Sequence, residues 1–453
     1  MPATFLAAAI AHLGAYRQAW LQATPNIHFA LTIILALVSI TAHAQYVVTV
    51  DPDQLSELAL TLHLPHDVAG PRKLFVRGTD MRINAQIDRP RCGLKPLRTT
   101  KDHAWLAPPN CKAVTWLVRP KPAQDGQSLA SDQASLLIAN RWVLLSEPSS
   151  FLRLADDKTS SSLKIETRSG QSIGFGATAL DNAHWRVSST NNAPEFFIIG
   201  DVAARTRAIG PFEVRYVSDD PSRVERLGLE SLHERALSYL AEVLPPPPEL
   251  PANERSLLVV WVGVDETKGR AGGSAGSRSF VANYIFGRPG AEAANTARSL
   301  LILSHEQFHQ LADLVRGALP PLPGWLSESL AHYYGLKALA TAMAGDTTGS
   351  IRAQFIDPAR PVAFGLLALG RRVTAGDDTA YPLFYSQGAT FWAEIDQSLR
   401  TNSPEPRSLD SLLPLLLRSR IDDSGALPAE FVGQLRQRLG NRADEIIGKY
   451  VGS

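Results

Sequence analysis

One short motif inside an apolar stretch constrains the fold of this sequence more than any other feature: HEQFH at residues 305–309. On a helix, His305 and His309 lie four positions apart on one face, with about 5 to 6 Å between their Cβ atoms, so both imidazoles can bind one ion. Apolar residues at helical spacing form a stripe beside the motif: Leu301, Phe308, Leu311 and Val315. We therefore expect a buried helix over residues 292–316 that carries two metal-binding histidines.

A third ligand is predicted at Glu328, 19 residues beyond His309. The first helix would end at Gly317, and the Pro-rich turn at 320–323 would reverse the chain. An antiparallel second helix then places Glu328 in its first turn, facing both imidazoles. Two histidines, a carboxylate and an open fourth position are the ligand set of a catalytic zinc site. The sequence thus predicts Zn2+ bound by these three residues, with Glu306 as general base toward a water molecule.

At these residues the sequence resembles the gluzincin metallopeptidases, in particular the aminopeptidase N and glycyl aminopeptidase families. HEQFH is followed by WLSESLAHYY at 325–334, and the resemblance covers roughly residues 250–400. It implies a thermolysin-like catalytic domain and extends to YSQG at 385–388, which is similar to a Tyr-x-Lys-Gly segment of those families. The resemblance implies that Tyr385 stabilises the oxyanion of the reaction. A packing tyrosine on an amphipathic helix is the alternative.

Three departures from the family pattern concern the substrate. The families carry an acidic residue that binds the free α-amino group, whereas the equivalent stretch 272–287 contains no Asp or Glu. Ser329 stands where those families usually have Gly, and Gln387 replaces the lysine. Neither substitution removes a ligand, but aminopeptidase activity is in doubt. The strand at 280–286 could instead pair with an extended peptide by edge addition, so exopeptidase and endopeptidase action both stay open.

Other residues near the motif have competing interpretations. GGSAG at 272–276 matches the nucleophile elbow of serine hydrolases, but a strand does not directly precede it and no helix pattern follows. We expect a flexible loop over the cleft there. His332 and Asp313 could each support a metal ligand from behind. A packing histidine and an exposed helix aspartate are the alternatives.

The rest of the chain predicts an α+β protein. Short alternating runs between residues 46 and 216 indicate an antiparallel β-sandwich-like domain. We expect a signal peptide at 1–44, the β domain at 45–220, a helix and Pro-rich linker at 221–250, the thermolysin-like catalytic domain at 251–400 and a helical C-terminal region at 401–453. Besides the first metal helix, helical segments are expected at 325–343, 382–400, 408–419 and 428–449.

The N-terminal segment predicts export. Residues 29–41 form an apolar run that is followed by Ala-His-Ala, the pattern of a signal peptide cleaved before Gln45. The run has about 13 residues, whereas a membrane span needs about 20. An uncleaved anchor stays open as the alternative. In the oxidising compartment of a secreted or periplasmic protein, Cys92 and Cys111 would form a disulfide. Without export they would be two buried thiols.

Charge argues against one class of partner. The chain has 45 Lys plus Arg and 44 Asp plus Glu, a net charge of +1, so it lacks the basic excess typical of nucleic-acid binding. We interpret the basic cluster between Arg82 and Lys121 as a solvated face of the β domain. The expected partner is a peptide or protein substrate, with membrane association only if the N-terminal segment is retained. The sequence favours an exported zinc-dependent peptidase, and a catalytically inactive peptide-binding protein is the alternative.

Overall fold

The computed structural model describes residues 44–65, 70–77, 85–124, 126–155, 158–189, 193–401 and 407–452. Except for Ala44, the predicted signal peptide lies outside the described residues. The chain divides into two compact units, Met1–Ala42 and His43–Ser453, and all elements below belong to the second. Within the described ranges, no helix combines the length and the apolar character needed to cross a membrane.

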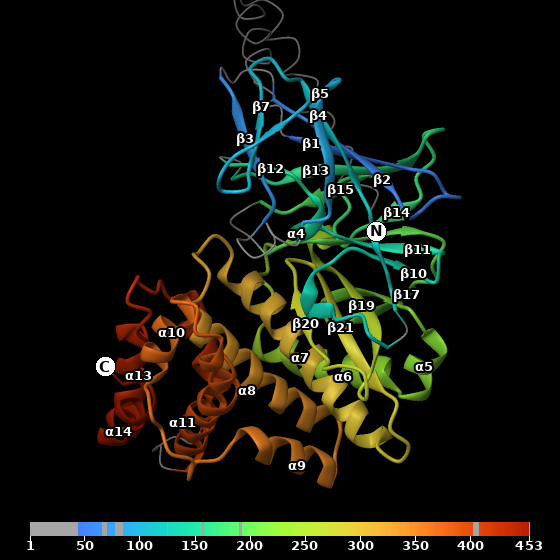
Figure 1. Cartoon of the computed structure of the whole chain (residues 1–453). Helices are drawn as coiled ribbons and strands as arrows, with labels where there is room; N and C mark the ends of the chain where they lie inside the picture. Colours follow the sequence, from blue (N-terminus) through green and yellow to red (C-terminus); the bar gives the residue numbers. More distant parts are fainter. Residues whose placement is uncertain are drawn as a thin grey trace, which may run out of the picture. The chain divides into compact units, whose positions relative to one another are not determined.

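Three sheets form the N-terminal β region (Figure 1). Their orders are β15-β13-β1-β2-β8-β4-β5, β14-β16-β11-β10-β9 and β12-β3-β7-β6. Burial alternates along strands such as β1 and β13, so one face of the sheet forms the core, which includes Val48, Leu60 and Trp116. Neighbouring strands are antiparallel except for the parallel pairs β1 with β13 and β9 with β10. The predicted β region is therefore confirmed, with these two parallel pairs as exceptions.

The bounds of these strands follow the alternating runs of the sequence. They are β1 Gln45–Val50, β2 Leu58–His63, β3 Arg72–Phe75, β4 Ile87–Cys92, β5 Lys95–Pro96, β6 Arg98–Thr99, β7 Trp105–Ala107, β8 Ala113–Val118, β9 Lys121–Pro122, β10 Leu136–Ile138, β11 Trp142–Ser146, β12 Arg153–Leu154, β13 Ser161–Thr167, β14 Gly174–Phe175, β15 His184–Val187 and β16 Phe196–Gly200. The predicted disulfide between Cys92 and Cys111 is present, with 5.9 Å between the Cα atoms. It joins the end of β4 to the residues just before β8.

A fourth sheet, in the order β17-β18-β19-β21-β20, packs against α7 (Glu292–Arg316), the helix that contains HEQFH. Its strands are β17 Arg205–Ile209, β18 Phe212–Ser218, β19 Ser256–Asp265, β20 Gly273–Ala275 and β21 Ser279–Phe286. β18 pairs parallel to β19, so the sheet begins before the boundary expected at residue 220. Alternation along β18 resembles that of the preceding strands, and alternation alone does not reveal which sheet a strand joins.

The helix expected with the Pro-rich linker in the segment 221–250 belongs to the hydrophobic core of the C-terminal part of the chain. α5 (Pro221–Arg226) and α6 (Leu229–Val243) follow β18, and Leu237 and Leu240 of α6 are fully buried in the hydrophobic cluster that also contains the metal helix. Only the proline run after α6 connects without regular structure of its own. The apolar stripe of α6 therefore reflects tertiary packing rather than a spacer between domains.

Strand β20 contradicts two expectations. The Gly-rich stretch is not a flexible loop along its whole length, because β20 pairs antiparallel with β21. β21 in turn lies between β19 and β20, so the strand expected to offer a free edge has none. β20 is one of the two edge strands of this sheet, and β17 is the other. Glycine disfavours strands, so residue propensities do not predict a third strand here.

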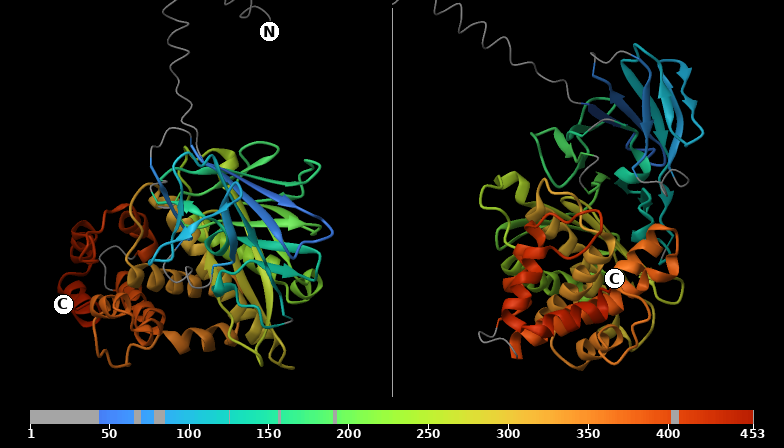
Figure 2. Two further views of the ribbon diagram at one scale, coloured as in Figure 1. Left: turned by 45° about the horizontal axis from the view of Figure 1, so that its top comes forward. Right: turned by 90° about the vertical axis from the view of Figure 1, so that its left-hand side faces the viewer.

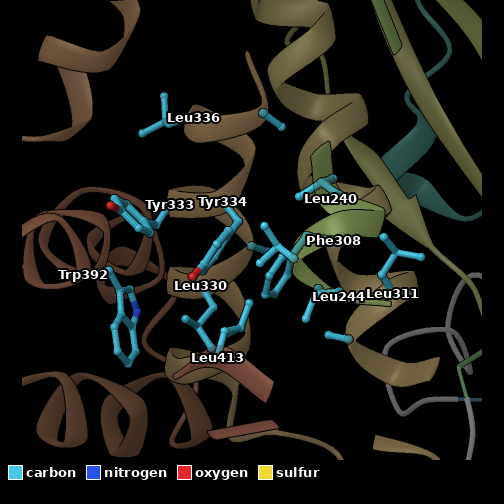
Figure 3. Close-up of a cluster of buried hydrophobic side chains, with 14 of the residues drawn as sticks. Leu240, Leu244, Phe308, Leu311, Leu330, Tyr333, Tyr334, Leu336, Trp392 and Leu413 are labelled. Carbon is cyan, nitrogen blue, oxygen red and sulfur yellow. The ribbon is translucent and has the colours of Figure 1, made fainter. Parts of the chain in front are cut away.

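The metal helix and its partner form the expected hairpin. α7 spans Glu292–Arg316, and α8 spans Gly324–Ala342. α7 ends at Gly317, whose φ of 58° is the left-handed conformation that glycine adopts most readily. In Figure 3, Phe308 of α7 lies between Leu240 of α6 and Tyr334 of α8. The Phe308 and Tyr334 rings stack with centroids 5.2 Å apart, so the apolar face of α7 holds the hairpin together.

The remaining helices follow α8 and gather together in both views of Figure 2, away from the blue strands of the N-terminal sheets. They are α9 Asp346–Phe355, α10 Leu366–Thr374, α11 Ala389–Thr401, α12 Leu413–Arg418, α13 Ala429–Leu439 and α14 Asn441–Tyr450. Two predicted helices are modified. A π-helical turn at Phe384–Gly388 precedes α11, and Gly440, with a φ of 56°, divides the segment expected at 428–449 into two helices.

Candidate metal centre and active-site cavity

Three predicted metal ligands converge between α7 and α8. The ligand atoms of His305, His309 and Glu328 all lie within 4.8 Å of one another. The two Nε2 atoms are 3.0 Å apart, and Glu328 Oε2 lies 3.2 Å from His305 Nε2 and 3.7 Å from His309 Nε2. Bonds of about 2 Å at tetrahedral angles require ligand separations of roughly 3 to 3.5 Å. The three donors therefore fit one zinc ion and leave a fourth position open.

The charges of the three ligands are tightly coupled. Burial opposes ionisation of Glu328, but the two imidazoles outweigh it and hold the pKa of Glu328 well below its usual value. Burial also disfavours the charged form of His309, yet the Glu328 carboxylate raises the pKa of His309 to about 9. In the metal-free protein, His309 is thus protonated at neutral pH. Metal binding must displace that proton.

Ser327 orients one ligand and was not predicted. Its Oγ lies 3.2 Å from Nδ1 of His309. Nδ1–H of His309 can donate to this hydroxyl, which leaves the lone pair of Nε2 directed toward the metal position. Ser327 directly precedes Glu328 in the first turn of α8, and this proximity to a predicted ligand was the clue available in the sequence.

Asp313 does not orient His309 in this way. It lines the same cavity as an exposed side chain.

Glu306 is held between the metal ligands and the edge strand. The residue is 8% exposed, and burial raises the pKa of its carboxyl group. The nearby backbone N–H of Ala275 offsets a small part of this rise. A Cβ on Gly273 would lie 2.5 Å from Glu306 Oε1, so only glycine allows this approach. Gly273 therefore makes room for the predicted base.

The same strand does not form a serine nucleophile site. Ser274 is buried in β20, and Gln133 Nε2 donates to its Oγ at 2.6 Å. A nucleophile elbow needs a sharp turn between strand and helix, whereas Ser274 has extended backbone paired with β21.

Two tyrosines cover the open side of the metal centre. The ring of Tyr385 lies 5.6 Å from that of His305. Tyr381, one helical turn earlier, was not predicted; its ring lies 5.6 Å from that of Tyr385, and its hydroxyl is close enough to Tyr385 and Glu328 for both to influence its pKa. Desolvation raises the pKa of both phenols, so both stay protonated donors at neutral pH. The i, i+4 spacing of the two tyrosines was the clue to the second.

His332 packs behind the centre. Its ring lies 4.2 Å from that of Phe355 and 5.1 Å from that of Tyr385. Burial, reinforced by the nearby His305, lowers the pKa of His332 to about 3, so it is neutral. Its contacts are mainly aromatic, which corresponds to the packing interpretation.

Ser329 and Gln387, the two departures from the family pattern near the ligands, are accommodated by the packing around them. Trp392 Nε1 donates to Ser329 Oγ at 2.9 Å, and a Cβ on Gly388 would lie 2.3 Å from Ser329 Cβ. The serine thus requires glycine opposite it. Gln387 is buried, and its amide donates to the carbonyls of Phe364 and Tyr450. Neither residue is among those that line the cavity.

A cavity of about 990 Å³ connects these groups. It contains the metal ligands, Glu306, both tyrosines and the edge strand β20, and it continues along α7 to Leu322. Charged residues line the far part: Arg77, Arg186, Glu249, Arg278, Asp313 and Arg316. The volume is large enough for several amino-acid residues of an extended peptide.

The architecture defines the class of the fold as that of the aminopeptidase N family of zinc metallopeptidases, so the predicted resemblance is confirmed for the fold. The crystal structure of an aminopeptidase N family protein from Idiomarina loihiensis superimposes with a TM-score of 0.64 at 13% identity, over 90% of this chain and 76% of that one. No family model matches the sequence, and no curated protein matches it.

Two further structures overlap more loosely. One is a two-domain M1 zinc metallopeptidase, with a TM-score of 0.44 at 13% identity over 91% of this chain and 94% of that chain. The other is Legionella pneumophila aminopeptidase A, with a TM-score of 0.48 at 11% identity over 91% of this chain and 49% of that chain.

Proposed function

We propose that this protein is a zinc-dependent metallopeptidase that hydrolyses peptide bonds after export from the cytoplasm. The convergence of His305, His309 and Glu328 on one point, with Glu306 beside them in the same cavity, carries the proposal. The aminopeptidase-type fold supports it independently. A catalytically inactive peptide-binding protein would not need a buried carboxylate beside the metal position.

In the proposed reaction, His305, His309 and Glu328 would hold the zinc ion. Zinc in such a site polarises a carbonyl group and lowers the pKa of a water molecule. Glu306 takes the proton of the attacking water and later delivers it to the leaving amine. Its raised pKa brings a carboxylate closer to the neutral range, where both transfers are efficient. Tyr385 donates a hydrogen bond to the oxygen on which negative charge develops.

The edge strand is proposed to bind the substrate backbone. β20 has one edge paired with β21, and it borders the cavity beside Glu306. An extended peptide can add to the other edge through main-chain hydrogen bonds. Neither Ser274 nor Ala275 supplies a carboxylate for a free α-amino group. We therefore propose recognition of an extended peptide through its backbone, without a requirement for capture of its N-terminus by this strand.

Export is supported by the disulfide between Cys92 and Cys111, because such bonds persist in oxidising compartments. The predicted leader lies outside the described residues, so mass spectrometry of the mature N-terminus is the direct test. An N-terminus at Gln45 is the expected result, and an intact chain recovered from the cytoplasm would contradict export.

Metal analysis combined with cleavage of a mixed peptide library tests the activity. We expect one zinc ion per chain, cleavage that chelator abolishes and restored cleavage after zinc is added back. The positions of the cleaved bonds distinguish exopeptidase from endopeptidase action. Bound zinc without cleavage of any library peptide would favour the binding protein.

A further inference from the structure

We propose that the β4–β5 hairpin of the N-terminal region docks this protein on an anionic lipid bilayer. The hairpin comprises β4, the turn Gly93–Leu94 and β5. None of its residues lines the active-site cavity, so the proposal is independent of the peptidase function. Three features carry it: an apolar tip, a local excess of positive charge and the position of the tip in the sheet.

The turn of the β4–β5 hairpin exposes an apolar side chain, Leu94. Leu94 is 94% exposed, whereas the other exposed large hydrophobic residues of the described chain are at most 49% exposed. The strands that hold it are fixed, because β4 pairs with β8 and the Cys92–Cys111 disulfide closes the base of the turn. An isolated exposed leucine is ordinary on a protein surface, but one at the apex of a cross-linked hairpin can enter a bilayer without unfolding anything.

Positive charge is concentrated around this tip. Residues 91–98, which contain the turn, include Arg91, Lys95 and Arg98 and no Asp or Glu, in a chain whose total net charge is +1. Arg91, Lys95 and Lys112 flank the turn as exposed side chains, and none forms an ion pair with a described residue. Unpaired cations around an apolar tip are the combination that an anionic membrane surface attracts.

Protection of a sheet edge explains only part of this pattern. β5 is the outermost strand of the seven-stranded sheet, and a short edge strand with lysine and proline resists pairing with another sheet. Lys95 and Pro96 satisfy that requirement. An exposed leucine beside them works against it, because apolar edges promote association. The combination of Leu94 with unpaired cations is instead suited to a partner that accepts an apolar group among cations.

The position of the tip gives the third argument. Gln45 pairs with His63, and His63 pairs with Ala113. Cys92 pairs with Val114 on one side and with Lys95 on the other. Alternating strand directions thus place the start of β1 and the hairpin turn at the same end of the sheet. The chain enters the sheet there, three residues after the apolar run 29–41.

A bilayer fits these features better than a nucleic acid. Phosphates of either partner would attract the cations, but only the bilayer buries Leu94. If the apolar run 29–41 contacts a membrane during or after export, the chain next enters the sheet at the end that carries the hairpin. The surface would keep the peptidase close to membrane-associated substrates.

Vesicle sedimentation of the chain that begins at Gln45, which contains the described unit, tests the proposal. Binding to phosphatidylglycerol–phosphatidylethanolamine vesicles should exceed binding to phosphatidylcholine vesicles and should fall with salt. Lys95→Glu should reduce the vesicle affinity about tenfold or more, since each cation near the surface contributes about fivefold. Arg420→Glu, an equal charge change at another exposed unpaired position, should have little effect.

Variants of Leu94 distinguish insertion of the hairpin tip into the bilayer from electrostatic attraction to its surface. Leu94→Asn should reduce vesicle affinity several-fold, and Leu94→Trp should raise it; both should fold normally and cleave a soluble peptide like the unchanged chain. Equal losses for Lys95→Glu and Arg420→Glu would overturn the proposal, because the effect would be one of net charge. Unchanged binding by Leu94→Asn, or equally tight binding to duplex DNA, would identify a general polyanion site and would also overturn it.

Discussion

The metal-binding hairpin and the edge strand border the same cavity, yet they relate to the family pattern in opposite ways. α7 and α8 present the expected ligands, base and spacing. β20 keeps the glycine that Glu306 requires but lacks the acidic residue expected for an α-amino group. In the proposed function, bond cleavage and recognition of the substrate thus depend on separate elements. A change in one element need not alter the other, and this independence can be tested.

Removal of the base should have the largest effect. Glu306→Gln keeps the shape of the side chain but cannot accept a proton from water at neutral pH. We expect kcat to fall by about 10²- to 10⁴-fold while zinc content stays at one per chain. Steady-state kinetics and metal analysis of the same preparation are the measurements. Full activity in this variant would remove Glu306 from its proposed role.

The tyrosine pair comes next. Tyr385→Phe should reduce kcat about 10²-fold, the typical cost of one donor to a developing oxyanion, with little change in KM. Tyr381→Phe should cost less, about tenfold, because its hydroxyl lies near Glu328 and Tyr385 rather than beside the reacting carbonyl. A larger loss for Tyr381 than for Tyr385 would exchange their roles. Circular dichroism of both variants controls for folding.

Orientation of a ligand by Ser327 should affect the metal rather than the chemistry. Ser327→Ala removes the partner of His309 Nδ1 and should weaken zinc affinity about 10- to 100-fold. Competition with a chelator of known affinity measures the change. With saturating zinc, kcat should return to near the unchanged value. A persistent loss of kcat would show that Ser327 also acts in the reaction.

The helical hairpin of α7 and α8 could be predicted from the sequence because its constraints are local. Histidine spacing, the glycine and prolines of the turn and the apolar stripe all depend on neighbouring residues, and α7 begins and ends where the pattern indicates. The membership of β18 depends on its pairing with β19, 43 residues further along the chain, which alternation does not encode. β20 pairs with the nearby β21, but its glycine-rich sequence lacks the residues that favour a strand. Ser327 and Tyr381 gain meaning only when α8 and the π-helical turn bring them to the centre.

The coupled charges of His309 and Glu328 in the α7–α8 hairpin predict how zinc binding depends on pH. Glu328 raises the pKa of metal-free His309 to about 9, and zinc binds the neutral imidazole. Zinc affinity should therefore fall as pH decreases below 9, by about tenfold per pH unit if one proton is displaced. Calorimetry in buffers of different ionisation enthalpy counts the released protons. Binding without proton release at pH 7 would show that the metal-free site is already neutral.

The smallest expected effect tests the edge strand itself. Ala275→Glu returns a carboxylate to β20, where it can pair with a substrate's free α-amino group at the mouth of the cavity. A partly exposed ion pair contributes up to about 1 kcal/mol, so we expect a shift of about fivefold toward substrates with a free N-terminus relative to the same peptides acetylated. Ala275→Gln is the matched control, because it adds similar volume without charge. Zinc content should be unchanged in both variants, since the ligands belong to α7 and α8. An equal change in preference for both variants would mean that side-chain volume at this edge, rather than charge, determines which end of a peptide is accepted.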